Sequence, residues 1–344
     1  MTLSRRLILG AGALAPLHYV VPARAQIARG SELTVGVWGG EQERILRQHV
    51  VAPLEGQYGV KCNLVLGGTP ERRARAYAER GNPSFDIVYL NISESRRAVK
   101  DGVTQAATDR VPNAAHLYAP AKLGGYGVAF NPVTVVYDKR AVSSPITSWK
   151  DLWRDELKGK LIWPSYPGAE GTAALLMAAK LWGGSETNIE PAFERIKALK
   201  PFAAIQGGQD QLYAMFDQGV GAASIEFGSF TQKYVETRNP NIVVADPTEG
   251  QVIAMNVACI TVGTKNQALA EAWINLHLAP DCQRAYAERI YYSPTVNNVE
   301  FPPELASKLV LGEQTRRLVD FDWDVVATQE PRWSSRFTRE IAAG

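Results

Sequence analysis

The sequence predicts an α/β fold built as two lobes, each assembled from separate parts of the chain. Short β-branched runs alternate with helix-like segments in the first 101 residues, which is the pattern of a parallel sheet covered by helices. The alternation starts again after residue 150. The apolar run 252–262 then offers a strand that can cross back, so both lobes are expected to be discontinuous in sequence.

The first lobe is predicted from three strand–helix units. Its strands are expected at residues 32–37, 60–66 and 85–90, and its helices at 41–54, 71–80 and 93–101. Glycines, Asn or Pro follow each strand, as expected for the turns that connect a strand to the next helix.

The second lobe begins near Asn131-Pro132, between two strand pieces within the run 126–137. Its further strands are expected at 160–163 and 221–225, and its helices at 171–182, 189–199 and 209–218. An amphipathic helix over 267–278 follows the return strand, because its apolar positions recur at helical spacing. We therefore expect lobe 1 at 26–132 with 257–305, and lobe 2 at 133–256 with 306–344.

Residues 1–25 are predicted to be an export signal. The pair Arg5-Arg6 precedes an apolar stretch, and the small side chains of Ala23 and Ala25 fit cleavage after Ala25. The segment 4–9 also resembles a twin-arginine motif, which leaves twin-arginine and general secretory export both open. Pro16 interrupts the apolar stretch well short of a membrane span. The mature protein is expected in the periplasm.

Charge excludes two classes of partner. The whole chain has a formal net charge of +2, and the signal carries three arginines and no acid, so the remainder falls to −1. Without a dense Lys/Arg run, nucleic acid and anionic membrane surfaces are poor partners. The odd set Cys62, Cys259 and Cys282 cannot pair completely within one chain, so at least one buried free thiol is expected.

No catalytic or metal constellation is recognisable. His49, His116 and His277 lie far apart and have no second ligand at the usual spacing. A nucleophile elbow, a phosphate-binding loop and a C-x-x-C pair are all missing from the sequence. We therefore predict no catalytic residue, cofactor or metal site, although a secreted α/β enzyme with unrecognised groups stays an alternative.

Polar, glycine and aromatic residues recur where the predicted strands end: Trp38, Gly39, Thr69, Asn91 and Ser93. In an open α/β sheet the carboxyl ends of the strands line the ligand crevice, where backbone N–H groups and helix N-termini can hold polar atoms. The alternative is that the glycines only close turns and Trp38 packs in the core.

The stretch 148–161, which reads SWKDLWRDELKGKL, resembles the extracellular solute-binding proteins of ABC importers. The similarity extends from about residue 33 to 341 and is strongest to the spermidine/putrescine-binding branch, with its iron- and phosphonate-binding relatives. It implies a type 2 periplasmic binding fold whose two lobes are joined by a two-crossing hinge. It also implies a monomer that captures a small molecule and delivers it to an ABC permease in the inner membrane.

The resemblance implies site residues but only part of the polyamine set. Trp38 and Tyr292 match family aromatics. Asn256 stands where the polyamine branch has an aspartate, and Thr172 stands where it has a glutamate. Glu226 falls at a cleft tryptophan position, where it could face one ammonium group.

The expected ligand is accordingly a small cationic nitrogen compound, held by aromatic and carboxylate contacts. A small oxyanion such as a phosphonate is the second possibility, with Thr69, Ser93 and Thr172 as neutral donors near a helix N-terminus. A sensor that binds ligand without transport fits the sequence equally well. Iron is disfavoured, because no adjacent tyrosines follow the strand near Ile225.

Overall fold

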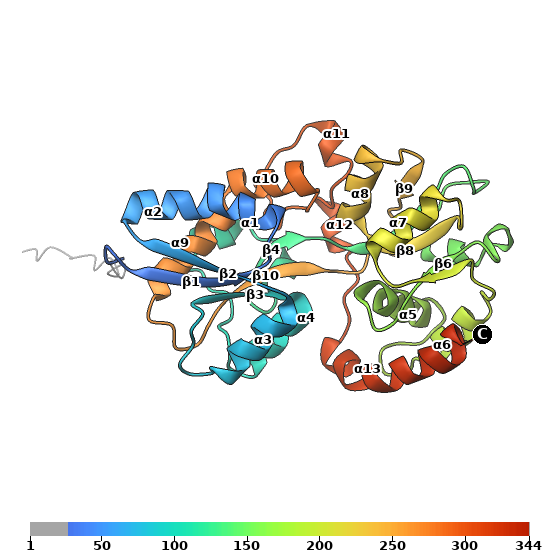
Figure 1. Cartoon of the computed structure of the whole chain (residues 1–344), viewed down its shortest axis with the longest axis horizontal. Coiled ribbons are helices and arrows are strands. Elements are labelled where there is room, and N and C mark those ends of the chain that lie inside the picture. The colour runs from blue at the N-terminus through green and yellow to red at the C-terminus, as the bar shows by residue number, and fades with distance from the viewer. Residues whose placement is uncertain (1–26, 344) are drawn as a thin grey trace, which may run out of the picture.

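The computed structural model describes residues 27–343 of the chain, so the predicted signal at 1–25 lies outside the described residues. Two lobes lie side by side along the long axis, and each has its own sheet with helices packed around it (Figure 1). The α/β class and the two lobes are confirmed. Among the described residues, no helix combines the length and the apolar character that a membrane crossing requires.

The first lobe contains a five-stranded sheet in the order β2-β1-β3-β10-β4. Its strands are β1 (Glu32–Val37), β2 (Lys61–Leu66), β3 (Ile87–Asn91), β4 (Tyr126–Phe130) and β10 (Met255–Ile260). β1 runs parallel to β2 and β3, as predicted, but β10 is antiparallel to β3 and β4. β10 enters directly from the second lobe, at the edge where β1 to β3 end, and therefore runs the opposite way.

Helices cover both faces of this sheet (Figure 1). They are α1 (Glu41–Leu46), α2 (Ala52–Tyr58), α3 (Thr69–Ala78), α4 (Ile92–Lys100), α9 (Gln267–His277) and α10 (Pro280–Ile290). A π-helical stretch over Arg47–Val51 joins α1 to α2, so the predicted helix over 41–54 is one continuous helical segment that ends four residues later. Helix α10 lies outside the elements that were predicted.

The second lobe contains a three-stranded sheet, β8-β5-β9, and a parallel pair, β6-β7. These strands are β5 (Val133–Asp138), β6 (Ile162–Pro164), β7 (Ala204–Gln206), β8 (Ala223–Phe227) and β9 (Ile242–Val244). The helices of the remaining chain are α5 (Ala169–Leu181), α6 (Glu190–Lys197), α7 (Gln209–Asp217), α8 (Gly228–Thr237), α11 (Pro303–Ala306), α12 (Glu313–Arg316) and α13 (Trp323–Phe337).

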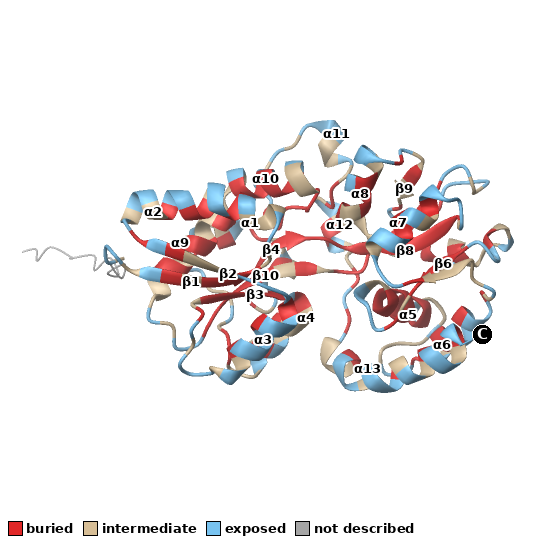
Figure 2. Cartoon of the chain, in the orientation of Figure 1, coloured by how far each residue is buried: buried red, intermediate tan, exposed pale blue. Residues whose placement is uncertain are grey.

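Helix α5 is the centre of the second lobe. Its side chains from Gly171 to Ala179 are all buried, and Figure 2 shows it enclosed by the rest of the lobe. A helix that is apolar on all sides belongs inside a protein. The N-terminal turn of α5 is thereby held in a fixed place at the edge of the lobe.

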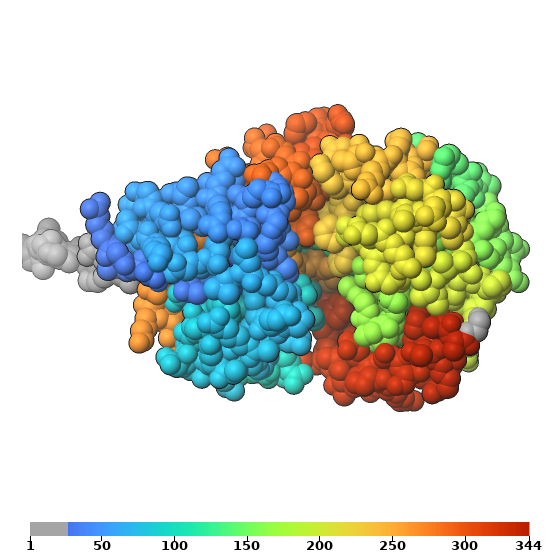
Figure 3. Space-filling model, in the orientation of Figure 1, coloured from blue at the N-terminus to red at the C-terminus, as the bar shows by residue number. Residues whose placement is uncertain are grey.

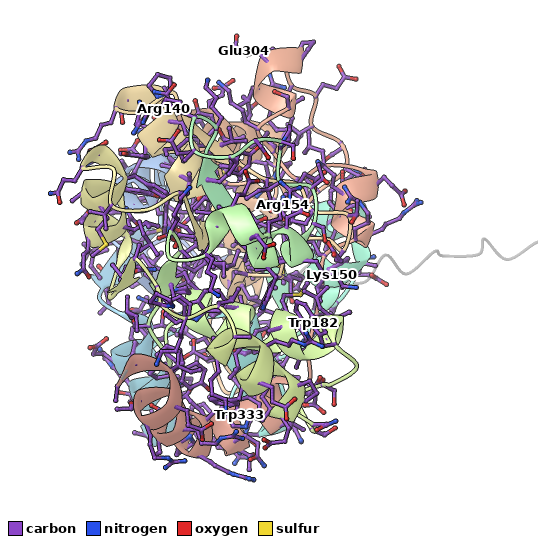
Figure 4. The ribbon with its side chains drawn as sticks, turned by 90° about the vertical axis from the view of Figure 1, so that its right-hand side faces the viewer. Arg140, Lys150, Arg154, Trp182, Glu304 and Trp333 are labelled. Atoms are coloured by element: carbon purple, nitrogen blue, oxygen red, sulfur yellow. The ribbon has the colours of Figure 1, made fainter. Side chains whose placement is uncertain are left out.

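The stretch 148–161, which carries the family resemblance, has a structural role. Trp149 is buried and donates from Nε1 to the backbone oxygen of Gly250 at 2.8 Å. The rings of Trp153 and Trp182 pack with centroids 4.3 Å apart. Lys150, Arg154 and Trp182 lie at the outer end of the second lobe (Figure 4), away from the other lobe. This stretch therefore packs within the second lobe and does not line the cavity between the lobes.

The connections between the lobes are hydrogen-bonded to one another. Val133, after the first crossing, and Val252, before the return, exchange backbone hydrogen bonds of 2.9 and 3.0 Å. The segment that leads to α13 is hydrogen-bonded to these connections as well, because the Ile253 amide donates to the Val319 oxygen at 2.9 Å. The predicted division into 26–132 with 257–305 and 133–256 with 306–344 stays a proposal; β10 already begins at Met255.

Candidate ligand-binding cleft

A cleft of about 950 Å³ lies between the two lobes and is lined by both. The space-filling view shows the surface indented where the blue and cyan lobe meets the yellow and red one (Figure 3). Most of the residues named from the sequence lie on its walls: Trp38, Thr69, Asn91, Ser93, Thr172, Asn256 and Tyr292. Gly39 lines a neighbouring hollow of about 360 Å³, which shares Gln42, Phe230 and Tyr292 with the cleft.

The strand-end turns of the first lobe form one wall. Thr69 begins α3, and Asn91 ends β3 and caps α4. The cap is reciprocal: the Asn91 side chain accepts from the third helical amide, while Glu94 accepts from the Asn91 amide at 3.3 Å. Helix N-termini therefore lie where the sequence predicted them, because parallel strands present their carboxyl ends at one edge.

Trp38 is half-buried, and its ring is clamped on one side. The guanidinium carbon of Arg72 lies 4.4 Å from the ring centroid, and the ring of Tyr89 meets it edge-on at 6.1 Å. Arg72 is 2% exposed and donates to the backbone oxygens of Tyr89, at 3.1 Å, and Gly67, and to Oγ1 of Thr69 at 3.4 Å. Burial lowers the pKa of Arg72 to about 10, so the group stays charged at neutral pH.

A chain of amide and hydroxyl groups crosses the floor of the cleft. Asn256 on β10 donates from Nδ2 to Gln42 Oε1 at 3.0 Å, and Gln42 donates from Nε2 to the Tyr292 hydroxyl at 3.4 Å. The Tyr292 ring lies 6.2 Å from that of Phe230, which belongs to α8 of the second lobe. Burial raises the pKa of Tyr292 to about 12, so its hydroxyl stays neutral.

Glu226 was expected to face the ligand, and this placement is wrong. Its side chain is fully buried at the end of β8 and does not line the cleft. Strand alternation explains the difference, because the next residue, Phe227, is the one that faces the cleft. The acid that lies between cleft-lining residues is Glu170, on the first turn of α5 beside Ala169 and Thr172.

Carboxylates outnumber cations along the cleft. The charged lining residues are Arg73, Glu94, Arg97, Asp101, Asp324 and Glu330, which gives a formal charge of −2. Several are already paired: Arg73 with Glu94 at 2.7 Å, and Asp324 with Lys100 across the two lobes at 2.5 Å. Glu330, on α13, has no salt bridge within residues 27–343.

Sequence reasoning missed Gln42, Phe230, Arg72 and Glu170. Gln42 and Phe230 lie on the first turns of α1 and α8, directly after strands β1 and β8. The rule that found Thr69 and Ser93 would have found both. Arg72 gave no comparable signal, because nothing in the charged helix α3 shows which arginine turns inward, and Glu170 gave none because a glutamate in the first turn of a helix is ordinarily exposed.

Neither a disulfide nor a cluster of metal ligands occurs within residues 27–343. Cys62, Cys259 and Cys282 are all free and buried there. Burial raises the pKa of the Cys62 thiol to about 11. No three His, Cys, Asp or Glu side chains in that range gather as ligands for a metal ion.

Comparison with known proteins identifies relatives of one kind. A family model described as bacterial extracellular solute-binding protein matches residues 82–321. The thiamine-binding periplasmic protein of Salmonella typhimurium is 25% identical over 209 residues, which are 60% of this chain and 61% of that protein. The spermidine/putrescine-binding periplasmic protein of Escherichia coli is 29% identical over 187 residues, 52% of this chain and 51% of that one.

The chain thus spans about half to three fifths of the length of these two curated relatives. A solved structure matches over a greater length. The crystal structure of an ABC transporter from Clostridium perfringens has a TM-score of 0.80 and 27% identity, covering 90% of this chain and 99% of that one. This likeness confirms the predicted two-lobed periplasmic binding fold.

Proposed function

The chain belongs to the bacterial extracellular solute-binding protein family, and from this we propose that it is the substrate-binding component of an ABC importer. It acts in the periplasm as a monomer, closes its lobes around a small molecule, and delivers that molecule to a permease in the inner membrane. Its output is binding and not bond-making. The cleft, the periplasmic relatives and the likeness to an ABC transporter structure support this role.

The ligand is a small cationic nitrogen compound, such as a short polyamine. The observation that carries this is the excess of carboxylates along the cleft, including Glu330 without a salt bridge within residues 27–343 and Glu170 beside the lining of the second lobe. Trp38, Phe230 and Tyr292 supply aromatic surface for the apolar parts of such a ligand. The two curated relatives named above bind thiamine and spermidine or putrescine, both of which carry positive charge.

A small oxyanion remains the second candidate, because one wall favours negative charge. Arg72 places a buried cation behind Trp38, and the N-termini of α3 and α4 carry Thr69 and Ser93. An anionic group would gain from these donors but would be repelled by the lining carboxylates, which include Glu94 on the same wall and Glu330 on the second lobe. The amine and the oxyanion therefore differ in which charged groups of the cleft would attract them.

Thermal-shift titration separates the two candidates. The probes are putrescine, spermidine, methylphosphonate and 2-aminoethylphosphonate, each titrated against the mature chain. We expect putrescine and spermidine to raise the melting temperature in a saturable way and methylphosphonate to leave it unchanged. A rise with methylphosphonate, and none with any amine, would show that the oxyanion reading is the correct one.

A further inference from the structure

Two acidic side chains meet at the cleft side of the second lobe. Glu226, at the end of β8, is fully buried; its Oε1 accepts from the Phe227 amide at 2.7 Å, and its Oε2 has no partner among the described residues. Glu170, on the first turn of α5, is the like-charged neighbour that acts on Glu226. Neither residue forms a salt bridge within residues 27–343.

The surroundings of Glu226 offer no positive charge. The titratable groups that face it are Glu170 from α5 and Tyr213 from α7, with Asp210 near that tyrosine. Thr134 lies opposite on β5, but its hydroxyl donates to the Ala245 backbone oxygen at 3.0 Å. Burial first, and then the like charge of Glu170, raise the pKa of Glu226 to about 8. With a like charge beside it and no cation to offset it, Glu226 keeps its proton at neutral pH while the cleft is empty.

If Glu170 and Glu226 had only a structural role, their burial would destabilise the fold. A buried carboxyl with an unpartnered oxygen costs desolvation energy, and an apolar side chain of similar size would avoid that cost. Glu170 is only half-buried and lies between Ala169 and Thr172, which line the cleft. Neither carboxyl lines the cleft itself, but Glu170 is partly exposed beside these two lining residues, whereas Glu226 is fully buried.

We propose that Glu170 and Glu226 form an ammonium subsite that exchanges a proton for the ligand: an amine cation that binds Glu170 expels the proton from Glu226. This rests on the proposed function, since it requires an amine ligand in the cleft. The charges balance. The empty pair has charge −1 with its proton; that proton leaves to solvent, and the ammonium group, with its own N–H donors, then neutralises part of a pair that carries −2.

Proton release makes the affinity depend on pH. Between the ordinary carboxyl range and the raised one, release of one proton predicts an affinity that rises about tenfold per pH unit. Glu226→Gln removes this dependence, because the side-chain amide has no proton to release on binding. The variant keeps the shape and the neutral state of the side chain, so it is expected to fold normally.

Calorimetric titration with putrescine tests the inference directly. At about pH 7, in phosphate and in Tris, the two apparent enthalpies give the number of protons released, because the buffers differ in ionisation enthalpy. We expect close to one proton for the native protein and close to none for Glu226→Gln. The matched control is Glu194→Gln, an exposed glutamate on α6, which should behave like the native protein.

The possible results distinguish a failure of the proton exchange from a failure of the proposed amine-binding function. If putrescine binds and no proton is released, or if Glu226→Gln releases as many protons as the native protein, the proton exchange is wrong and the amine-binding function stands. If neither putrescine nor spermidine binds the native protein, the ligand class itself is wrong, and the subsite falls with it. Unchanged circular dichroism of Glu226→Gln excludes misfolding as the cause.

Discussion

Replacement of Arg72 by methionine tests whether the first wall of the cleft is assembled before ligand arrives. The guanidinium joins the turn after β2, through the Gly67 oxygen, to strand β3, through the Tyr89 oxygen, and lies against Trp38 from the turn after β1. Methionine keeps much of the aliphatic stem but removes all these polar contacts. The backbone oxygens of Gly67 and Tyr89 are then left without this donor.

The expected loss follows from those contacts. Each hydrogen bond from the charged donor contributes about 1.5–3 kcal/mol. The contact with Trp38 adds about 0.5–2 kcal/mol. The substitution also removes the desolvation cost of the buried Arg72 charge, which offsets several kcal/mol of this total. We therefore expect the free energy of unfolding to fall by about 2–4 kcal/mol.

Urea unfolding followed by circular dichroism measures this change, with Arg73→Met as the matched control. Arg73 is the next residue on α3, its side chain is 48% exposed, and it pairs with Glu94 at the surface of the cleft. Loss of that exposed pair should cost no more than about 1 kcal/mol. Equal effects of the two substitutions would refute the view that Arg72 holds the wall together.

Three further predictions test other parts of the structure. Asn256→Asp introduces a carboxylate on the floor of the cleft and should tighten putrescine binding by about 1.5–3 kcal/mol in calorimetry, the usual value of a charge-assisted bond; an unchanged affinity would remove this residue from the site. Tyr89→Phe removes a buried hydroxyl that accepts from Trp273 at 2.9 Å and contacts His277 at 2.6 Å. The free energy of unfolding in urea should fall by about 1–3 kcal/mol. A loss below the error of the measurement would show that these hydrogen bonds do not stabilise the fold. Arg336, and then Lys197, lower the pKa of Glu340 to about 2 from 4.5. The ionised carboxylate therefore stabilises the fold fully above pH 4.5, and this contribution is lost as the pH falls between the two values. Glu340→Gln should make the free energy of unfolding less dependent on pH in this acidic range, and an unchanged dependence would contradict the assignment.

The first lobe was the more predictable half of the fold. The β-branched run that begins at Glu32 became β1, which ends at Val37, just before the glycine turn. Among the elements that escaped prediction, three have a plain physical reason. β9 and β7 are only three residues long, and α13 contains Pro331. Patterns this short or interrupted give no clear periodicity.

The site was predictable wherever a strand-end rule applied. Thr69, Asn91 and Ser93 reached the cleft because the ends of parallel strands must meet at one edge. Glu226 failed because a shift of one residue along a strand turns the side chain to the opposite face. Such a shift is invisible without a partner strand to set the register. Contacts between distant segments, such as Asn256 with Gln42, depend on how the lobes pack and leave no pattern in the sequence.

Native mass spectrometry of the protein purified from periplasm, without refolding, tests the central claim most directly. The account predicts one small amine for each chain, released on denaturation and retained less well by Glu170→Gln than by Glu194→Gln. A bound phosphonate, or another anion without a nitrogen cation, would contradict it.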